Sequence, residues 1–235
     1  MAYLRLDRLL SNICNTTRSD ITRAIKRGRV TVNGEVVKKP DFKADTQTDT
    51  ITLDGNTLNI AEFVYIMMNK PKGVVCTTDE RESTVFDVLP DNMRRREMFT
   101  VGRLDKDTTG LLIITDDGKF VHNAAHSKSG VIKRYIANLA EPLTDDAVKT
   151  LSEPMTLSDG TKISGGEIKI LSDDRMTVEI GIREGKYHQI KRMAGAVGNK
   201  VTALKRVSMG EILLDESLSL GECRYLNEDE IKVYK

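Results

Sequence analysis

The chain has 235 residues, with 36 Lys and Arg against 35 Asp and Glu, so its net charge of +1 indicates no particular partner. This length can bury one large core or two smaller ones. The cysteines, Cys14, Cys76 and Cys223, lie far apart without the spacing of a zinc site or a disulfide framework, which is typical of a reducing cytosol. Charged residues interrupt the apolar N-terminus, so we expect no signal peptide. No apolar run approaches the roughly 18 residues that span a bilayer, so we expect a soluble, cytoplasmic protein without a membrane partner.

The N-terminal segment predicts a compact module of two helices and a hairpin. Apolar residues at helical spacing mark a first helix over residues 6–13. Ser19 is expected to cap a second helix, which Gly28 ends. Alternating residues 30–32 then predict a strand, and Asn33-Gly34 predicts a two-residue hairpin turn.

This module has an uneven charge. Residues 18–43 contain eight basic side chains and three acidic ones. Such a cluster is either a solvated helix surface or a phosphate-binding patch. The order Arg5-Leu-Asp-Arg8, Arg18-Ser-Asp20 and Lys26-Arg-Gly-Arg-Val-Thr-Val-Asn-Gly34 resembles the S-four domain, an RNA-binding module. The resemblance implies that the basic side chains contact RNA, and the candidates are Arg18, Arg23, Lys26, Arg27 and Arg29.

Residues 56–63 lack clean periodicity and predict a linker, which divides the chain into domains at residues 1–58 and 62–235. Residues 64–68 then predict a short buried strand. The Pro and Gly that follow break this strand and leave Lys70 and Lys72 on a turn.

The second domain is organised around Val101-Gly-Arg-Leu-Asp-Lys-Asp-Thr-Thr-Gly-Leu-Leu-Ile-Ile-Thr-Asp-Asp-Gly118. A polar loop carrying Arg103, Asp105 and Asp107 runs into an apolar strand at residues 111–114. Asp117-Gly118 is suited to a tight turn after it. Asp105 therefore lies just before the strand, with an Arg two residues away, and is a candidate reaction centre. The alternative is an ordinary loop rich in Asp and Gly.

Three later segments carry further patterns. Residues 133–139 alternate as a strand that includes Tyr135, and residues 176–182 alternate as another. Apolar spacing then predicts a helix that starts close to His188 and ends near Gly198. Seven basic residues oppose one acidic residue between positions 183 and 206.

The central stretch resembles the catalytic motif of the rRNA pseudouridine synthases. Gly102-Arg-Leu-Asp105, Thr108-Thr-Gly-Leu111 and Thr115-Asp-Asp-Gly118 are most similar to the small-ribosomal-subunit pseudouridine synthase A family. Lys133-Arg-Tyr135 and Glu184-Gly-Lys-Tyr-His-Gln-Ile-Lys-Arg-Met193 resemble further motifs of the family. The resemblance implies an α+β fold: a small S-four-like RNA-binding domain, then a catalytic domain on a mixed, mainly antiparallel sheet with a cleft across its middle.

The implied reaction breaks the C1′–N1 glycosidic bond of uridine, turns the base and joins C5 to C1′, without cofactor or metal. It needs an ionised carboxylate near the sugar, for which Asp105 is the candidate. This carboxylate either attacks C1′ or takes the 2′ proton. Lys191 would keep it ionised, in a position where many relatives have Arg, so bidentate pairing is lost. The resemblance places Tyr135 in the active site, where it would stack on the uracil and help to remove the C5 proton.

The resemblance also implies that the target nucleotide leaves its helix, and Arg103 would fill the gap or contact phosphate. Further candidate RNA contacts in this domain are Lys70, Lys72, Lys186 and Arg192. The expected partner is ribosomal RNA or a small-subunit assembly intermediate, bound by a monomer. Tyr187-His-Gln-Ile-Lys-Arg192 favours the small subunit, with large-subunit rRNA as the alternative substrate.

Two other functions compete with this hypothesis. A non-enzymatic, ribosome-associated RNA-binding factor would explain the basic patches but not the loop of Asp105. A magnesium phosphohydrolase would use Asp105, Asp107, Asp116 and Asp117 as ligands. The four-residue strand between the two pairs spans roughly 13 Å, which is too far for one ion.

Overall fold

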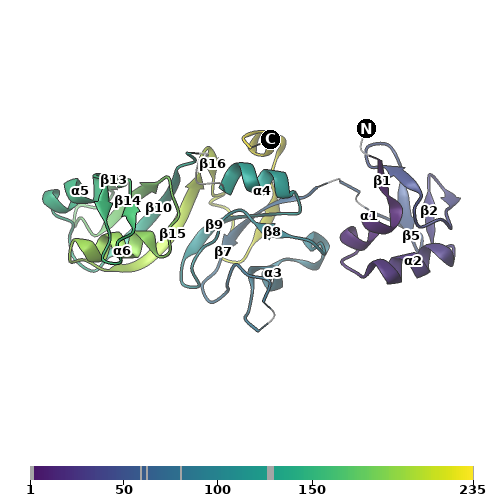
Figure 1. The fold of residues 1–235 in the computed structure, drawn as a ribbon, viewed down its shortest axis with the longest axis horizontal. Helices are drawn as coiled ribbons and strands as arrows, with labels where there is room; N and C mark the ends of the chain where they lie inside the picture. The colour runs from purple at the N-terminus through teal and green to yellow at the C-terminus, as the bar shows by residue number, and fades with distance from the viewer. Residues whose placement is uncertain (1–2, 59, 62, 80, 126–129, 235) are drawn as a thin grey trace. The chain divides into compact units, whose positions relative to one another are not determined.

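The computed structural model describes residues 3–234, apart from 59, 62, 80 and 126–129 (Figure 1). The chain forms two compact units. Unit 1 comprises Met1–Val64, Pro90–Phe99 and Thr115–Asp117, and unit 2 comprises Tyr65–Leu89, Thr100–Ile114 and Gly118–Lys235. The division at residues 1–58 and 62–235 stays a prediction, and residues 1, 62 and 235 lie outside the described part. Among the described residues, no helix has the length and apolar character needed to cross a membrane.

Two helices pack together in unit 1, α1 (Leu6–Ile13) and α2 (Arg18–Lys26). Their buried faces share one core, to which Leu6, Leu10 and Ile25 contribute fully buried side chains. The predicted cap at Ser19 is wrong. The hydroxyl of Thr17 accepts a hydrogen bond from the Asp20 backbone N–H at 3.1 Å, because the helix begins one residue before Ser19.

Short antiparallel strands complete unit 1. They are β1 (Tyr3–Arg5) with β4 (Lys43–Asp45), and a sheet in the order β3 (Glu35–Val36), β2 (Val30–Val32), β5 (Ile51–Leu53) and β6 (Asn56–Thr57). Asn33 and Gly34 have φ of 53° and 84°, as a type I′ turn requires, which confirms the hairpin. Strand β6 occupies the start of the predicted linker, so that prediction is wrong for residues 56–57.

A mixed sheet forms the centre of unit 2. Within the described residues its strands follow the order β13 (Glu167–Ile170), β14 (Thr177–Ile182), β10 (Lys133–Leu139), β15 (Val201–Met209), β9 (Thr109–Thr115), β7 (Tyr65–Lys70) and β17 (Cys223–Tyr225), with β16 (Ile212–Leu213) on β15 and β8 (Phe99–Thr100) on β9. Strands β9 and β15 run parallel, whereas β10 pairs antiparallel with both of its neighbours. The expected mixed, mainly antiparallel sheet is confirmed.

The parallel pair places three segments at the middle of this sheet. Arg206 of β15 lies in register with Gly110 of β9 on one side and with Tyr135 of β10 on the other. The loop that carries Asp105 enters β9 directly before this point. The register therefore brings that loop close to Tyr135, although the two are far apart in the sequence.

Helix α4 (Gly118–Ala125) lies beside β9 and β7 (Figure 1). Its Phe120 is buried in the same core cluster as Leu111 and Met67, and its ring centroid lies 4.9 Å from that of Tyr65. Burial of a Phe side chain stabilises a fold by roughly 1.5–3 kcal/mol. The helix begins at Gly118, so the tight turn predicted at Asp117-Gly118 is wrong: after the strand the chain turns into a helix.

The remaining elements lie mostly in unit 2. They are α3 (Val85–Val88), the 3-10 helix η1 (Asp91–Met93, in unit 1), α5 (Asp145–Ser152), β11 (Met155–Thr156), β12 (Lys162–Ile163), α6 (Gln189–Ala196) and α7 (Glu228–Lys232). The helix predicted to start near His188 is confirmed as α6, for which His188 is the N-cap residue.

Candidate active site

Hydrogen bonds from the side chain of Lys70 hold the backbone of the loop before β9. The Nζ of Lys70 donates hydrogen bonds to the carbonyl oxygens of Pro71 (3.0 Å), Asp105 (3.1 Å) and Thr108 (3.0 Å). The residue is fully buried, and burial lowers the pKa of its ammonium group. The structure contradicts Lys70 as an RNA contact, because its charge is used inside the protein to shape the loop.

Lys191, in the first turn of α6, joins two carboxylates of this loop. Its Nζ lies 3.0 Å from Oδ2 of Asp105 and 2.6 Å from Oδ1 of Asp107. Burial acts to lower the pKa of Lys191, but the hydrogen bonds to Asp107 and Asp105 outweigh this effect and raise it. The hydrogen bond from Lys191 lowers the pKa of Asp107. One ammonium group therefore bridges two carboxylates. The Asp105 side chain is 29% exposed and that of Asp107 is 67% exposed.

His188 lies on the other side of Asp105. Its Nε2 is 3.6 Å from Oδ1 of Asp105, which is too far for a hydrogen bond. His188 has a left-handed backbone, with φ of 48°, directly before α6. The sequence indicated the start of this helix but gave no sign of the left-handed residue that aims the imidazole.

Asp105 opens onto a cavity of about 580 Å³, within the size range of small-ligand sites. Tyr135 and His188 also line this cavity, and a smaller hollow of about 70 Å³ that includes Lys191 adjoins it through shared residues. The three predicted catalytic residues, Asp105, Tyr135 and Lys191, thus come together around one hollow. Arg103 is exposed and lines both parts of it.

Two buried cations border the same cavity and were missed from the sequence. Arg206 is 1% exposed; its Nε donates to the Leu111 carbonyl at 2.7 Å, and its buried Nη2 has no hydrogen-bond partner among the described residues. Lys133 donates to the Val131 and Arg183 carbonyls. Burial, followed by repulsion from Arg206, lowers the pKa of Lys133. The signal for Arg206 was its place in β15, because strand alternation puts it in the buried row with Leu204.

The predicted RNA contacts of unit 1 are exposed, and most pair with acids. Arg18 bonds the carboxylate of Asp7 at 3.1 and 3.2 Å. Two further pairs are Arg23 with Asp20 and Arg29 with Asp54. Lys26 and Arg27 are also exposed. All five remain predictions as RNA contacts.

The predicted RNA contacts of unit 2 differ from one another. Lys72 and Lys186 are exposed, and Lys186 also lines the cavity. Arg192 pairs with Asp159 and donates to the carbonyl of Tyr187 at 3.1 Å, so much of its guanidinium is used within the protein. Their contacts with RNA stay predictions.

Asp116, one of the four candidate magnesium ligands, lies in unit 1, whereas Asp105 lies in unit 2. It accepts hydrogen bonds from Asn12 Nδ2 (2.9 Å), Arg95 Nη1 (2.8 Å) and the Val64 backbone N–H (2.8 Å), all within unit 1. In the part of the chain that the structure describes, no group of three or more His, Cys, Asp or Glu side chains could hold a metal ion. Nothing in this geometry favours the phosphohydrolase hypothesis.

Comparison with known proteins identifies families for both parts of the chain. Residues 64–196 match the model of the RNA pseudouridylate synthase family, and residues 4–51 match the S4 domain. The chain is 40% identical to "Ribosomal small subunit pseudouridine synthase A" of Vibrio vulnificus, with 97% of this chain and 98% of the relative covered. It is 39% identical to "Uncharacterized RNA pseudouridine synthase YtzG" of Bacillus subtilis, with 97% of each covered.

A solved structure, "Crystal structure of pseudouridylate synthase", has the same fold. It superposes with a TM-score of 0.67 at 37% sequence identity and covers 97% of this chain and 98% of its own. The N-terminal S4 domain and the catalytic fold expected from the sequence are both confirmed. The chain belongs to the RNA pseudouridylate synthase family and is an isomerase that converts uridine in RNA to pseudouridine.

Proposed function

We propose that this synthase modifies one uridine of small-subunit (16S) ribosomal RNA, with Asp105 as its catalytic carboxylate. The Vibrio vulnificus relative is named a ribosomal small subunit pseudouridine synthase, and its similarity extends over 97% of this chain, which supports the choice of RNA. The segment from Tyr187 to Arg192 also favours the small-subunit branch of the family. The substrate is ribosomal RNA or a small-subunit assembly intermediate in the cytoplasm, bound by a monomer whose S4 domain provides part of the RNA contact.

One observation carries the catalytic assignment: the 3.0 Å contact between Lys191 and Asp105 at the edge of a nucleotide-sized cavity. A carboxylate that is partly withdrawn from water tends to become neutral, and a neutral acid can neither attack C1′ nor accept the 2′ proton. The ammonium of Lys191, 3.0 Å away, supplies a counter-charge to the Asp105 carboxylate. In either route the electrons of the C1′–N1 bond leave with the uracil, and they return when C5 bonds to C1′.

Tyr135 and Arg103 have supporting roles in this proposal. Tyr135 is 7% exposed and lines the cavity beside Asp105, which suits a ring that stacks on a uracil withdrawn from its helix. After C5 has joined C1′, the proton on C5 must leave, and the phenol oxygen is a candidate acceptor. Arg103 is exposed at the rim, where it fills the gap in the RNA or contacts a phosphate.

The test is Asp105→Asn, which keeps the shape of the side chain and removes its charge. We expect no measurable tritium release from 5-tritiated uridine in small-subunit rRNA, together with unchanged RNA affinity. Asp173→Asn, at an exposed position of the same unit, is the matched control and should keep full turnover. Turnover by the Asp105 variant would remove Asp105 from the mechanism.

The choice of RNA has its own test. Pseudouridines mapped in rRNA from a deletion strain should lack one site in the small subunit. Loss of a site in large-subunit rRNA instead would favour the alternative substrate and leave the role of Asp105 open.

A further inference from the structure

Tyr187 is an exposed aromatic residue in the turn before α6. The residue is 76% exposed, the highest value among the exposed large hydrophobic residues in the described part of the chain. The ring nevertheless has a defined setting. It stacks on the imidazole of His188, with centroids 3.8 Å apart and planes inclined by 21°. One face of Tyr187 is covered by His188, and the high exposure leaves the other face to solvent.

The turn that carries this pair is fixed by hydrogen bonds on both sides. Arg192 Nη1 donates to the Tyr187 carbonyl at 3.1 Å, and Arg192 is itself paired with Asp159. The Lys186 backbone N–H donates to Oε1 of Gln189 at 3.0 Å. His188 adopts the left-handed conformation that a non-glycine residue rarely takes. Such backbone states cost energy and cluster at active sites and ligand clamps.

The stacked pair also lies at the candidate active site. Both rings line the cavity of about 580 Å³ that contains Asp105, and His188 Nε2 lies 3.6 Å from that carboxylate. Basic side chains border the same hollow, among them Arg103 and Lys186 at exposed positions. A polyanion drawn in by these charges would bring its bases past the open face of Tyr187.

We propose that Tyr187, backed by His188, is a stacking platform for the base of a nucleotide next to the target uridine. This inference rests on the proposed function and names a second RNA subsite, separate from the uracil position at Tyr135. Single-stranded RNA is recognised largely through bases stacked on aromatic rings, and each such contact contributes about 1–3 kcal/mol. The platform would hold the flanking base while the uridine occupies the cavity, and so favour targets with an unpaired neighbour.

The experiment uses the full chain with Asp105→Asn, so that the RNA is bound but not converted. The probe is a short single-stranded RNA with a central uridine, together with a series in which one flanking nucleotide at a time is abasic. Tyr187→Ala should weaken binding of the intact RNA about 5- to 150-fold, which corresponds to the loss of one stacked base. Tyr187→Phe should bind the RNA as tightly as the parent, which is the chain with Asp105→Asn alone, because the aromatic ring remains. Tyr225→Ala, at another exposed tyrosine of unit 2, is the matched control and should also keep the parent affinity.

The abasic series makes the result specific. At one flanking position, removal of the base should cost the parent as much affinity as Tyr187→Ala does, and the two losses should not add. Equal binding of Tyr187→Ala and the parent, or additive losses at every position, would overturn the platform. The proposed chemistry is tested separately, by tritium release. A protein without turnover on small-subunit rRNA could still have the platform, and a protein with turnover could lack it.

Discussion

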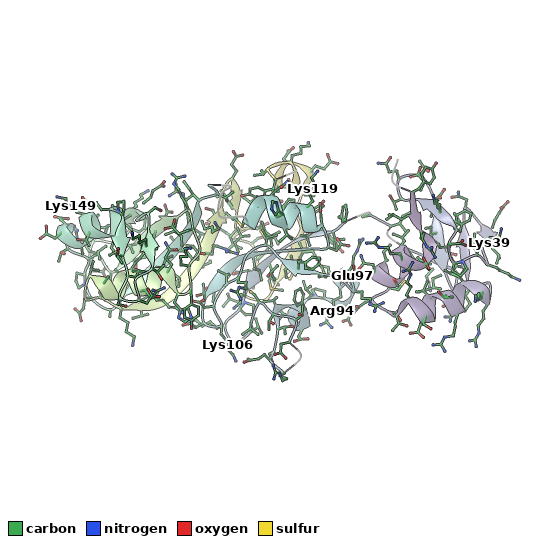
Figure 2. All side chains as sticks on the ribbon, viewed as in Figure 1. Lys39, Arg94, Glu97, Lys106, Lys119 and Lys149 are labelled. Atoms are coloured by element: carbon green, nitrogen blue, oxygen red, sulfur yellow. The ribbon has the colours of Figure 1, made fainter. Side chains whose placement is uncertain are left out.

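The buried ammonium of Lys70 donates a hydrogen bond to the carbonyl oxygen of Asp105 at 3.1 Å. Two further carbonyls complete its coordination, so a single side chain on β7 fixes both ends of the segment between Asp105 and Thr108. That segment contains Asp107 and the exposed Lys106; Figure 2 labels Lys106. The position of the candidate catalytic carboxylate is thus set by a residue that lies outside the motif.

Lys70→Met should lower both stability and turnover. The thioether fills a similar volume but leaves three carbonyl oxygens without their donor. The buried carbonyl of Thr108 alone costs about 1–3 kcal/mol when it is left unsatisfied. Urea unfolding should report that loss, and tritium release should fall because the loop of Asp105 is no longer held. Lys149→Met, at an exposed lysine of the same unit, should change neither quantity. An unaffected turnover in Lys70→Met would mean that the loop keeps its shape without this support.

The ion pairs of Lys191 should make stability depend on pH at both ends of the scale. The pKa of Asp107 is lowered from 3.8, so its contribution is present above that value and is lost as the pH falls through the folded-state pKa. The pKa of Lys191 is raised from 10.5, so its contribution is present below that value and is lost as the pH rises through the folded-state pKa. Between these limits both contributions are complete.

Lys191→Met should therefore cost at most about 1 kcal/mol of unfolding free energy at pH 7, because Asp107 is largely exposed to solvent. Urea unfolding at pH 7 and pH 2 should show that the difference from the wild type shrinks at the lower pH. Lys200→Met, at an exposed site, should differ from the wild type by the same small amount at both pH values. A difference for Lys191→Met that does not change with pH would contradict the pairing with Asp107.

Gly110 explains why the motif has a glycine at the start of β9. Its φ is 100°, and a Cβ at this position would lie 2.2 Å from the carbonyl oxygen of Arg206 on the parallel strand β15. Gly110→Ala should destabilise the protein by at least about 3 kcal/mol, because both the backbone strain and the backbone contact must be relieved. The melting temperature should fall by roughly 6–12 °C, as measured by circular dichroism.

The matched control is Gly118→Ala. Gly118 has no positive φ, and a Cβ there meets nothing within 4 Å. As the first residue of α4, it should accept alanine with a change within about 1 kcal/mol. Equal melting temperatures for the two variants would mean that β9 and β15 can separate without cost.

Local patterns in the sequence predicted those parts of the structure that depend on neighbouring residues. The strand over residues 133–139 has the bounds of β10, and the apolar spacing after His188 is that of α6. The burial of Lys70 could not be predicted in this way, because two of its three acceptors come from a loop 35 and 38 residues further along the chain. Arg206 was missed for a similar reason. Its place beside both Gly110 and Tyr135 depends on sheet order, which no single segment encodes.

Asp116 and Arg95 form a buried ion pair in unit 1 at 2.8 Å, with side chains 2% and 5% exposed. The same carboxylate accepts hydrogen bonds from Asn12 and from the Val64 backbone. Asp116→Ala should destabilise the protein by about 3–5 kcal/mol, because it leaves the Arg95 guanidinium buried without its carboxylate. Urea unfolding measures this loss, and Asp91→Ala is the control, since the Asp91 carboxylate is 97% exposed and pairs with Arg94 only at 3.5 Å. If both variants unfold at the same urea concentration, water or another group must solvate Arg95, and the ion pair would not hold unit 1 together.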